Sequence, residues 1–267
     1  MDNIENKKPK TKHQHYIPVF LLKNFCNENG QVSVYDKKTN KSYLTTPKEI
    51  CHEKYLYESK LTDDYFSNPN ALENKFSEME GHWATLIDRI IKICDNKNNL
   101  GRLILNSSEK RELTELFFNI FARNPYNMKI LSDTAENLGW HDTFHILSEF
   151  GIGEDKHICK NFDLHVAFED CQLKNDFCKE LVSSYFYVGY SAKEDICISN
   201  CPFAVGDSNL LFALLPISPK YAVFWSPTKI REKSNILIPF TPNVAPKIRE
   251  HYMKFDAVRF IISKPKK

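Results

Sequence analysis

Two histidines near the amino end are the residues whose types and spacing suggest chemistry most directly. His13 and His15 stand two apart in the stretch TKHQHYIPVF, and in an extended segment residues two apart point to the same side. Two neighbouring imidazoles can bind a metal, hold a phosphate or share a proton. A metal would need further ligands, because zinc sites use three or four. The structural alternative is that one histidine caps or packs while the other meets solvent.

Carboxylates in the stretch ENKFSEMEG could complete such a site. Glu73 and Glu80 are seven residues apart and fall on nearly the same face of a helix. Their separation along the axis, about 10 Å, is too large for both to share one metal. We therefore assign Glu80 to a divalent metal together with His13 and His15. The alternative is a solvated acidic edge on an amphipathic helix, with Glu73 complementing the helix dipole.

An arginine closes the predicted second helix, in the stretch FARNP. The guanidinium of Arg123 could grip a carboxylate or phosphate with two parallel hydrogen bonds. It could equally satisfy the last carbonyls of its own helix. In an enzyme acting on phosphates, the same group would stabilise charge on a phosphoryl oxygen.

A second metal candidate is the stretch HDTFH, which places His141 and His145 four apart on one helix face. This spacing is that of zinc proteases, although Asp142 stands where their catalytic glutamate is expected. Spacing does not specify a third ligand. The eight cysteines contain no C-x-x-C pair, so they do not form a zinc framework of their own.

Hydrophobic periodicity predicts a helical middle of the chain. Apolar residues recur at three- and four-residue spacing over 68–96 and again over 108–122. Pro125 should end the second helix, because the residue before a proline disfavours the helical conformation. We expect further helices over 126–138, 140–151 and 163–183.

Strands are predicted on both sides of that middle. A β-hairpin is expected within 30–46, where apolar stretches flank the polar turn DKKTNK. Five short aromatic or β-branched strands follow residue 184, with a hairpin turning at 218–220. Other expectations are a helix or buried strand over 16–25, a turn and irregular structure over 46–58, a helix over 244–254 and a last strand over 257–263.

This order of elements predicts an α+β fold with an N-terminal β-hairpin, a helical middle and a C-terminal, mostly antiparallel sheet. No long linker separates the halves, so we expect a single domain over 13–263. It would lie between a disordered basic tail over 1–12 and a basic tail over 264–267.

Composition narrows the classes of function. The net charge of +2 over 267 residues does not demand a nucleic-acid partner. There is no run of about 18 apolar residues to span a membrane and no apolar signal peptide, so we expect a cytoplasmic protein with reduced cysteines and no membrane partner. No P-loop, G-x-S-x-G or dinucleotide glycine pattern is present, which argues against common kinase, hydrolase and dehydrogenase folds.

The ordered stretches HQHYIPVFLLKNF, VSVYDKK, TPKEICHEKYLYE, LENKFSEMEGHWATLI, FARNP, ISNCPFAV, LLPISPKYAVFW and AVRFIIS resemble the bacterial domain-of-unknown-function 4238 (DUF4238) family. The resemblance spans about residues 12–263. Relatives typically have adjacent histidines, which Gln14 separates here, and a serine-aspartate-asparagine-proline turn. Ser199 and Asn200 occupy the first two positions of that turn, so the aspartate is absent. The resemblance adds both to the candidate catalytic residues.

Two functions remain as hypotheses. One is a hydrolase directed at phosphates, a nuclease or nucleotide hydrolase, with nucleic acid or nucleotide as its partner and a divalent metal as a conceivable cofactor. In it His13 or His15 acts as base or metal ligand, Glu80 as metal ligand and Arg123 on the phosphoryl oxygen. The other is a non-catalytic binding or regulatory module, for example in a defence or mobile-element system. Convergence of these side chains in the fold favours the first hypothesis.

Overall fold

The computed structural model describes residues 13–54, 56, 71–96, 105–127, 179, 181, 183–202, 213–226, 229, 237–256 and 258–266, without the side chains of residues 71 and 72. The pair His141 and His145 lies outside these residues. So do the helix predicted over 140–151, all but the first two residues of the helix predicted over 126–138, the basic tail over 1–12 and most of 163–183.

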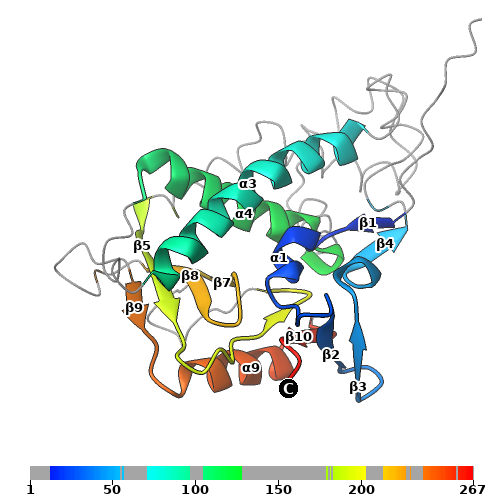
Figure 1. Ribbon diagram of the computed structural model, residues 1–267. Coiled ribbons are helices and arrows are strands. Elements are labelled where there is room, and N and C mark those ends of the chain that lie inside the picture. The colour runs from blue at the N-terminus through cyan, green and yellow to red at the C-terminus, as the bar shows by residue number, and fades with distance from the viewer. Residues whose placement is uncertain are drawn as a thin grey trace, which may run out of the picture.

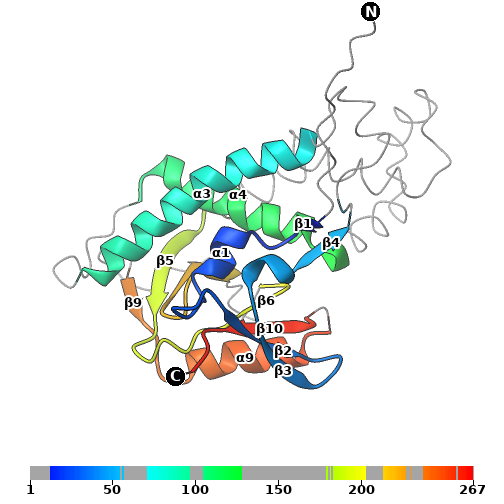
Figure 2. The same ribbon diagram turned by 45° about the vertical axis from the view of Figure 1, so that its right-hand side comes forward.

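Two long helices, α3 (Ala71–Asp95) and α4 (Ser107–Arg123), lie side by side above the rest of the fold (Figures 1 and 2). Both were predicted from apolar periodicity, and both are confirmed. The side chains that α3 buries recur at three- and four-residue spacing: Phe76, Trp83, Leu86, Ile87, Ile90 and Cys94. This stripe packs into the same hydrophobic core as the buried face of α4.

Local side-chain contacts fix both ends of α4. Asn106 accepts a hydrogen bond from the backbone N–H of Glu109, whose carboxylate in turn accepts one from the N–H of Asn106, both at 2.9 Å. This capping box satisfies two backbone donors that the first helical turn leaves unbonded. At the other end Asn124 leaves the helical conformation, with φ −68° and ψ 125°. The stop predicted from Pro125 is confirmed.

One four-stranded sheet lies under these helices, with the order β7-β8-β5-β9. All pairs are antiparallel except β5 with β9, which are parallel. Every residue of β8 is buried, because the strand lies between two neighbours and beneath α4, where Trp225 packs on Phe117 at 5.1 Å between ring centroids. The strands are β5 (Tyr185–Tyr190), β7 (Ala213–Pro216), β8 (Tyr221–Ser226) and β9 (Leu237–Pro239).

A second sheet brings the two ends of the chain together, with the order β3-β2-β10-β6. The predicted hairpin is confirmed as β2 (Val32–Asp36) and β3 (Lys41–Thr45), but it is not a separate unit: β2 pairs with β10 (Phe260–Ser263). That strand pairs in turn with β6 (Ile198–Ser199), and α9 (Val244–Lys254) contacts β10. The α+β class is confirmed.

The residues before and after the hairpin form a small unit at the end of the helical layer. The apolar run over 16–25 contains a helix, α1 (Val19–Lys23), which Pro18 precedes as its N-cap. Within 46–58 the expected turn is the short 3₁₀ helix η1 (Pro47–Glu49). Strand β4 (His52–Lys54) stands where irregular structure was expected, and that part of the expectation was wrong. Strand β4 has no apolar alternation of its own and exists by pairing with β1 (His13–His15).

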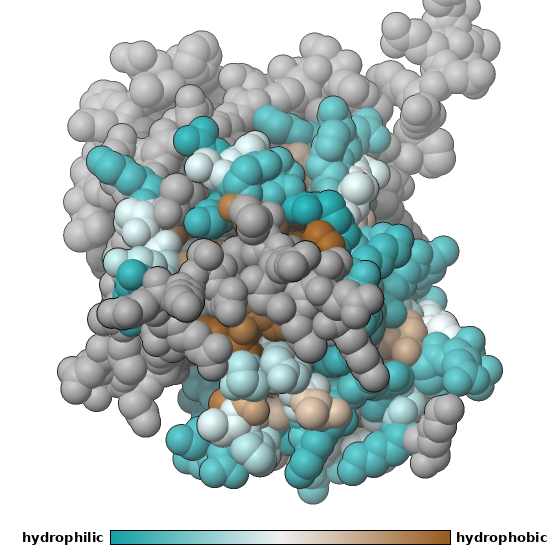
Figure 3. All heavy atoms as spheres, turned by 60° about the vertical axis from the view of Figure 1, so that its left-hand side comes forward, coloured by the Kyte–Doolittle hydropathy of each residue, from teal (hydrophilic) through white to brown (hydrophobic). Residues whose placement is uncertain are grey.

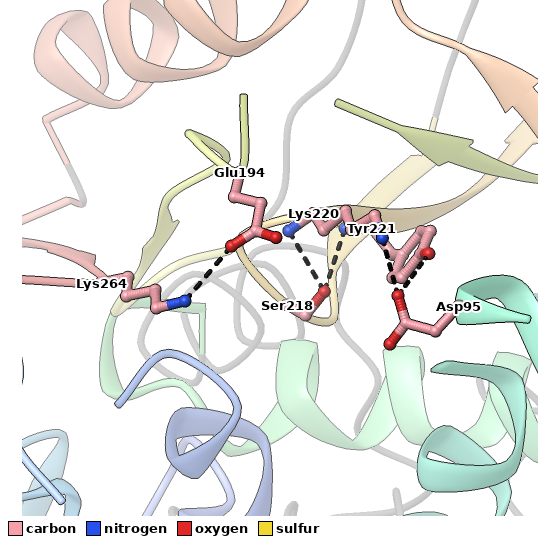
Figure 4. Close-up of polar contacts among 6 residues, drawn as sticks. All are labelled: Asp95, Glu194, Ser218, Lys220, Tyr221 and Lys264. Carbon is pink, nitrogen blue, oxygen red and sulfur yellow. Dashed lines mark hydrogen bonds and ion pairs between the residues drawn. The ribbon is translucent and has the colours of Figure 1, made fainter. Parts of the chain in front are cut away.

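The carboxyl end of α3 is fastened to the β7–β8 turn (Figure 4). Asp95 accepts hydrogen bonds from Lys220 Nζ at 2.7 Å and from the Tyr221 hydroxyl at 2.8 Å. Ser218 holds the turn by accepting from the backbone N–H groups of Lys220 and Tyr221. The polar contacts here join the helical layer to the sheet, and their partial exposure limits their contribution to stability.

Exposed large apolar side chains occur on several of the described elements. Hydrophilic residues predominate among those coloured in Figure 3, and the large apolar side chains that are more than 40% exposed are spread over several elements: Tyr43, Leu44, Tyr126, Tyr185 and Met253. Among the described helices, none combines the length and apolar character needed to cross a membrane.

Gly189 in β5 leads to a prediction about packing. A Cβ built on Gly189 would lie 1.9 Å from the Phe240 ring, whereas one built on Gly81 in α3 would meet nothing within 4 Å. We expect Gly189→Ala to lower the free energy of unfolding by about 1–3 kcal/mol, as overpacking does. Gly81→Ala is the matched control and should raise it by about 0.5–1 kcal/mol. Urea denaturation measures both, and a neutral Gly189→Ala would contradict the packing.

Candidate functional site

A buried arginine connects both long helices to the first strand. Arg123 is 2% exposed, and its Nη1 donates to Glu80 Oε1 of α3 at 2.6 Å. The same nitrogen donates to Asn119 Oδ1, one turn earlier in α4, at 3.2 Å, and Nη2 donates to the backbone carbonyl of His15. The guanidinium carbon lies 4.4 Å from the centroid of the Phe76 ring. We call Arg123, Glu80, Asn119, Phe76 and the His15 carbonyl the arginine network.

The network satisfies a charge that would otherwise be costly to bury. An ionised side chain away from water needs both a counter-charge and hydrogen-bond acceptors, and Glu80, Asn119 and the His15 carbonyl supply them. Glu73, two turns before Glu80, lies near the same charges. Burial raises the pKa of Glu73, the charge of Arg123 lowers it and that of Glu80 raises it. Both helix glutamates therefore face Arg123.

Three imidazoles gather on strands β1 and β4. The carboxyl end of α4 lies beside these strands (Figures 1 and 2). His15 is directly opposite His52 in the β1–β4 register. The centroid of the His52 ring is 4.7 Å from that of His13 and 5.2 Å from that of His15. We call His13, His15 and His52 the histidine cluster.

Hydrogen bonds determine the protonation of these rings. Nδ1 of His13 lies 3.2 Å from Nδ1 of His52, so one of the two nitrogens carries the proton and the other accepts it. Nε2 of His15 lies 3.1 Å from the Lys48 carbonyl. A carbonyl can only accept, and His15 must therefore carry its proton on Nε2.

Burial favours the neutral form of two of these rings, His15 and His52. It lowers the pKa of His15 to about 4, an effect that the Lys48 hydrogen bond opposes and that nearby His52, Arg123 and His13 reinforce. The pKa of His52 is also lowered, by burial and then by His13, against the opposing charge of Glu49. Neutral imidazoles carry the lone pair that a base or a metal ligand needs.

The cysteine beside His52 is not an activated nucleophile. Cys51 is 2% exposed, and burial raises the pKa of its thiol well above the usual range, an effect that a hydrogen bond with Tyr16 opposes. A reactive cysteine needs the thiolate. Its backbone is left-handed, with φ 58°, and its carbonyl accepts from the N–H of Tyr16 at 3.0 Å. Cys51 thus shapes the turn that leads into β4.

A comparison with protein families matches this part of the chain. The family described as "Protein of unknown function (DUF4238)" matches residues 13–171. The chain belongs to the DUF4238 family. No match is found among the curated proteins or among the solved structures. The matched span begins at His13 and includes the whole histidine cluster and the whole arginine network of this DUF4238 protein.

Ser199 and Asn200 lie beyond the matched span, and their side chains form hydrogen bonds with backbone groups. Ser199 is fully buried, and its Oγ donates to the Cys201 carbonyl at 2.7 Å. Asn200 Oδ1 accepts from the backbone N–H groups of Arg259 and Phe260 at 2.7 and 2.8 Å. Ser199 thus holds the local turn and Asn200 connects that turn to the start of β10, and their catalytic role stays a prediction without support from these contacts.

The metal site predicted from His13, His15 and Glu80 does not form among the described side chains. Glu80 pairs with Arg123, while His15 and His13 turn toward Lys48 and His52. In the described part of the chain, no three histidine, cysteine, aspartate or glutamate side chains are placed to hold a metal ion.

His52 is the site residue that sequence reasoning missed. It lies in the stretch ICHEK, 37 positions after His15, and no local sequence pattern predicts a strand there. The one feature of the sequence that could have pointed to His52 is that it lies in TPKEICHEKYLYE, one of the stretches that resemble the DUF4238 family. Only the β1–β4 register makes it the neighbour of His13 and His15.

Removing the buried guanidinium should be strongly destabilising. We expect Arg123→Met to lower the free energy of unfolding by about 3–5 kcal/mol, because it removes the hydrogen bonds that Arg123 donates to Glu80 and to the His15 carbonyl. Lys92→Met is the control: Lys92 pairs with Asp88 in α3, but these side chains are 74% and 60% exposed, and the loss should stay below about 0.5 kcal/mol. Urea denaturation compares them, and equal losses would contradict the network.

The low pKa of His15 predicts how stability changes with pH. Between pH 6.5 and 4 the unfolded chain binds a proton at His15 that the folded chain does not. Stability should therefore fall as pH falls through this window, by about 1.4 kcal/mol per pH unit for one proton. His15→Gln should remove that part of the slope. The measurement is the free energy of unfolding at pH 4.5–7.5 for both proteins; identical slopes would show that His15 titrates normally when folded.

Proposed function

We propose that this DUF4238 protein is a phosphate-directed hydrolase, acting on a nucleic acid or a nucleotide, whose acid–base groups are His13 and His52. The observation that carries the proposal is the 3.2 Å contact between their Nδ1 atoms. General acid–base catalysis needs a proton donor and an acceptor within reach of the same substrate. Two imidazoles in contact, of which His13 is exposed and His52 half-buried, supply both.

The remaining predicted residues take supporting roles in this proposal. Arg123 holds the His15 backbone, and with it β1, against both long helices. Its burial argues for positioning and against contact with a phosphoryl oxygen. Positive charge for binding phosphate is available from Lys54, the cross-strand partner of His13.

We further propose that the protein works in the cytoplasm. The cysteines that the structure describes are free thiols: Cys26, Cys51, Cys94, Cys197 and Cys201. Thiols persist in a reducing compartment.

One observation favours the second candidate, a binding or regulatory module without catalysis. Two of the residues first assigned to catalysis use their polar groups in hydrogen bonds within the fold. Arg123 donates to its network, and Asn200 accepts from two backbone N–H groups. A site with imidazoles alone could bind an anion without turning it over.

The test is hydrolysis by the purified full chain of RNA, DNA and nucleoside mono-, di- and triphosphates, each with Mg²⁺ and with EDTA. We expect activity on at least one of them, and a loss of about 10²–10⁴-fold in His13→Gln and His52→Gln. His82→Gln is the matched control, because His82 is exposed on α3 and should keep full activity. Inactivity on the whole panel would favour the binding module.

A further inference from the structure

The hydrogen bond between His13 and His52 determines which nitrogens the pair presents outward. When both rings are neutral, the ring that donates from Nδ1 has a lone pair on Nε2, and the ring that accepts at Nδ1 carries its proton on Nε2. The contact joins Nδ1 to Nδ1 at 3.2 Å. The neutral pair therefore always offers one basic Nε2 and one Nε2–H, whichever ring donates.

Among the described residues, no other hydrogen bond occupies the outer nitrogens of this pair. His13 is exposed and His52 half-buried, and within the described part of the chain their mutual contact is the one hydrogen bond that these two rings make. The described charged or titratable groups around the pair are His15, whose pKa His13 and His52 influence, Glu49, which acts on His52, Arg123, which acts on His15, and Lys54, which lies across the strands from His13.

From this geometry we infer that His13 and His52 form a proton relay that cleaves RNA by attack of the 2′-hydroxyl. This inference rests on the proposed function and names its substrate class. In one turnover the basic Nε2 takes the proton of the 2′-hydroxyl, and that ring passes its Nδ1 proton to the Nδ1 of its partner. The partner releases its own Nε2 proton to the departing 5′-oxygen.

The step is balanced without a further reactant. The 2′-oxygen–phosphorus bond forms, the bond from phosphorus to the 5′-oxygen breaks, and the products are a 2′,3′-cyclic phosphate and a 5′-hydroxyl. One proton enters the pair and one leaves it, so the two rings end with their tautomers exchanged. Exchange with water, or a turnover in the opposite sense, restores them.

RNA is the phosphate substrate that such a pair suits best. Its nucleophile is already part of the substrate, next to the phosphorus, and an intramolecular nucleophile gains a large effective concentration. A pair that only moves protons then completes the reaction. DNA lacks this hydroxyl and would need a separately activated water.

The first experiment compares a 5′-labelled RNA with DNA and 2′-O-methyl RNA of the same sequence, using the full chain. Cleavage of RNA alone, with 2′,3′-cyclic phosphate termini, is the expected result, and it should fall at least 100-fold in His52→Gln but not in His82→Gln. Equal cleavage of DNA, or hydrolysis of nucleotides alone, would overturn the RNA assignment while the proposed function stands. No reaction with any of these substrates overturns both.

The pH profile separates a relay from an ordinary acid–base pair. A relay works with both rings neutral, so the RNA cleavage rate should rise as the pair loses its proton and then stay level to about pH 9. An ordinary pair needs one protonated ring and gives a bell-shaped profile, which would overturn the relay.

A spectroscopic measurement tests the pair without any activity. Imidazole ¹⁵N spectra of the wild-type protein at pH 8, assigned with His13→Gln and His52→Gln, should show one of these rings protonated on Nδ1 and the other on Nε2. Both rings protonated on Nε2 would overturn the relay, because no Nδ1 proton would then be left for the hydrogen bond.

Discussion

The burial of one guanidinium is the constraint on which the rest of the site depends. Arg123 is almost fully removed from solvent at the end of α4, where an uncompensated charge would be prohibitively costly. Its partners come from three separate parts of the chain: Glu80 in α3, Asn119 in α4 and the carbonyl of His15 in β1. The position of the first strand is therefore tied to the packing of the two long helices.

That tie has a chemical consequence. Because Arg123 holds the main chain of His15 and leaves the side chain to Lys48, the imidazoles of β1 project toward β4 and meet His52. Burial then lowers the pKa of His15 and of His52. The cationic anchor and the histidine cluster thus meet at the same short strand, and the charge of Arg123 itself disfavours protonation of His15.

The same principle of satisfying buried polar groups explains the role of Asn200. Its side-chain Oδ1 accepts from the consecutive backbone N–H groups of Arg259 and Phe260, at the start of the last strand, and its backbone carbonyl accepts from Asn124 at 2.5 Å. An amide oxygen accepts such bonds without carrying a charge. Asn200 therefore connects the turn after β6 both to β10 and to the end of α4.

The sequence by itself determined the elements whose signals are local: the apolar stripes of α3 and α4, the stop before Pro125, the hairpin of β2 and β3 and the strands after residue 184. It also singled out Glu80 and Arg123, which form an ion pair, and His13 and His15, which contact His52 and Lys48 instead of Glu80. Tertiary structure alone decided the partners. The short strand β4 has no periodicity, so only its pairing with β1 places His52 beside His13, and whether Arg123 faces a ligand or Glu80 depends on helix packing. Local patterns report how a segment buries its own apolar side chains, whereas contacts between distant segments depend on which surfaces meet.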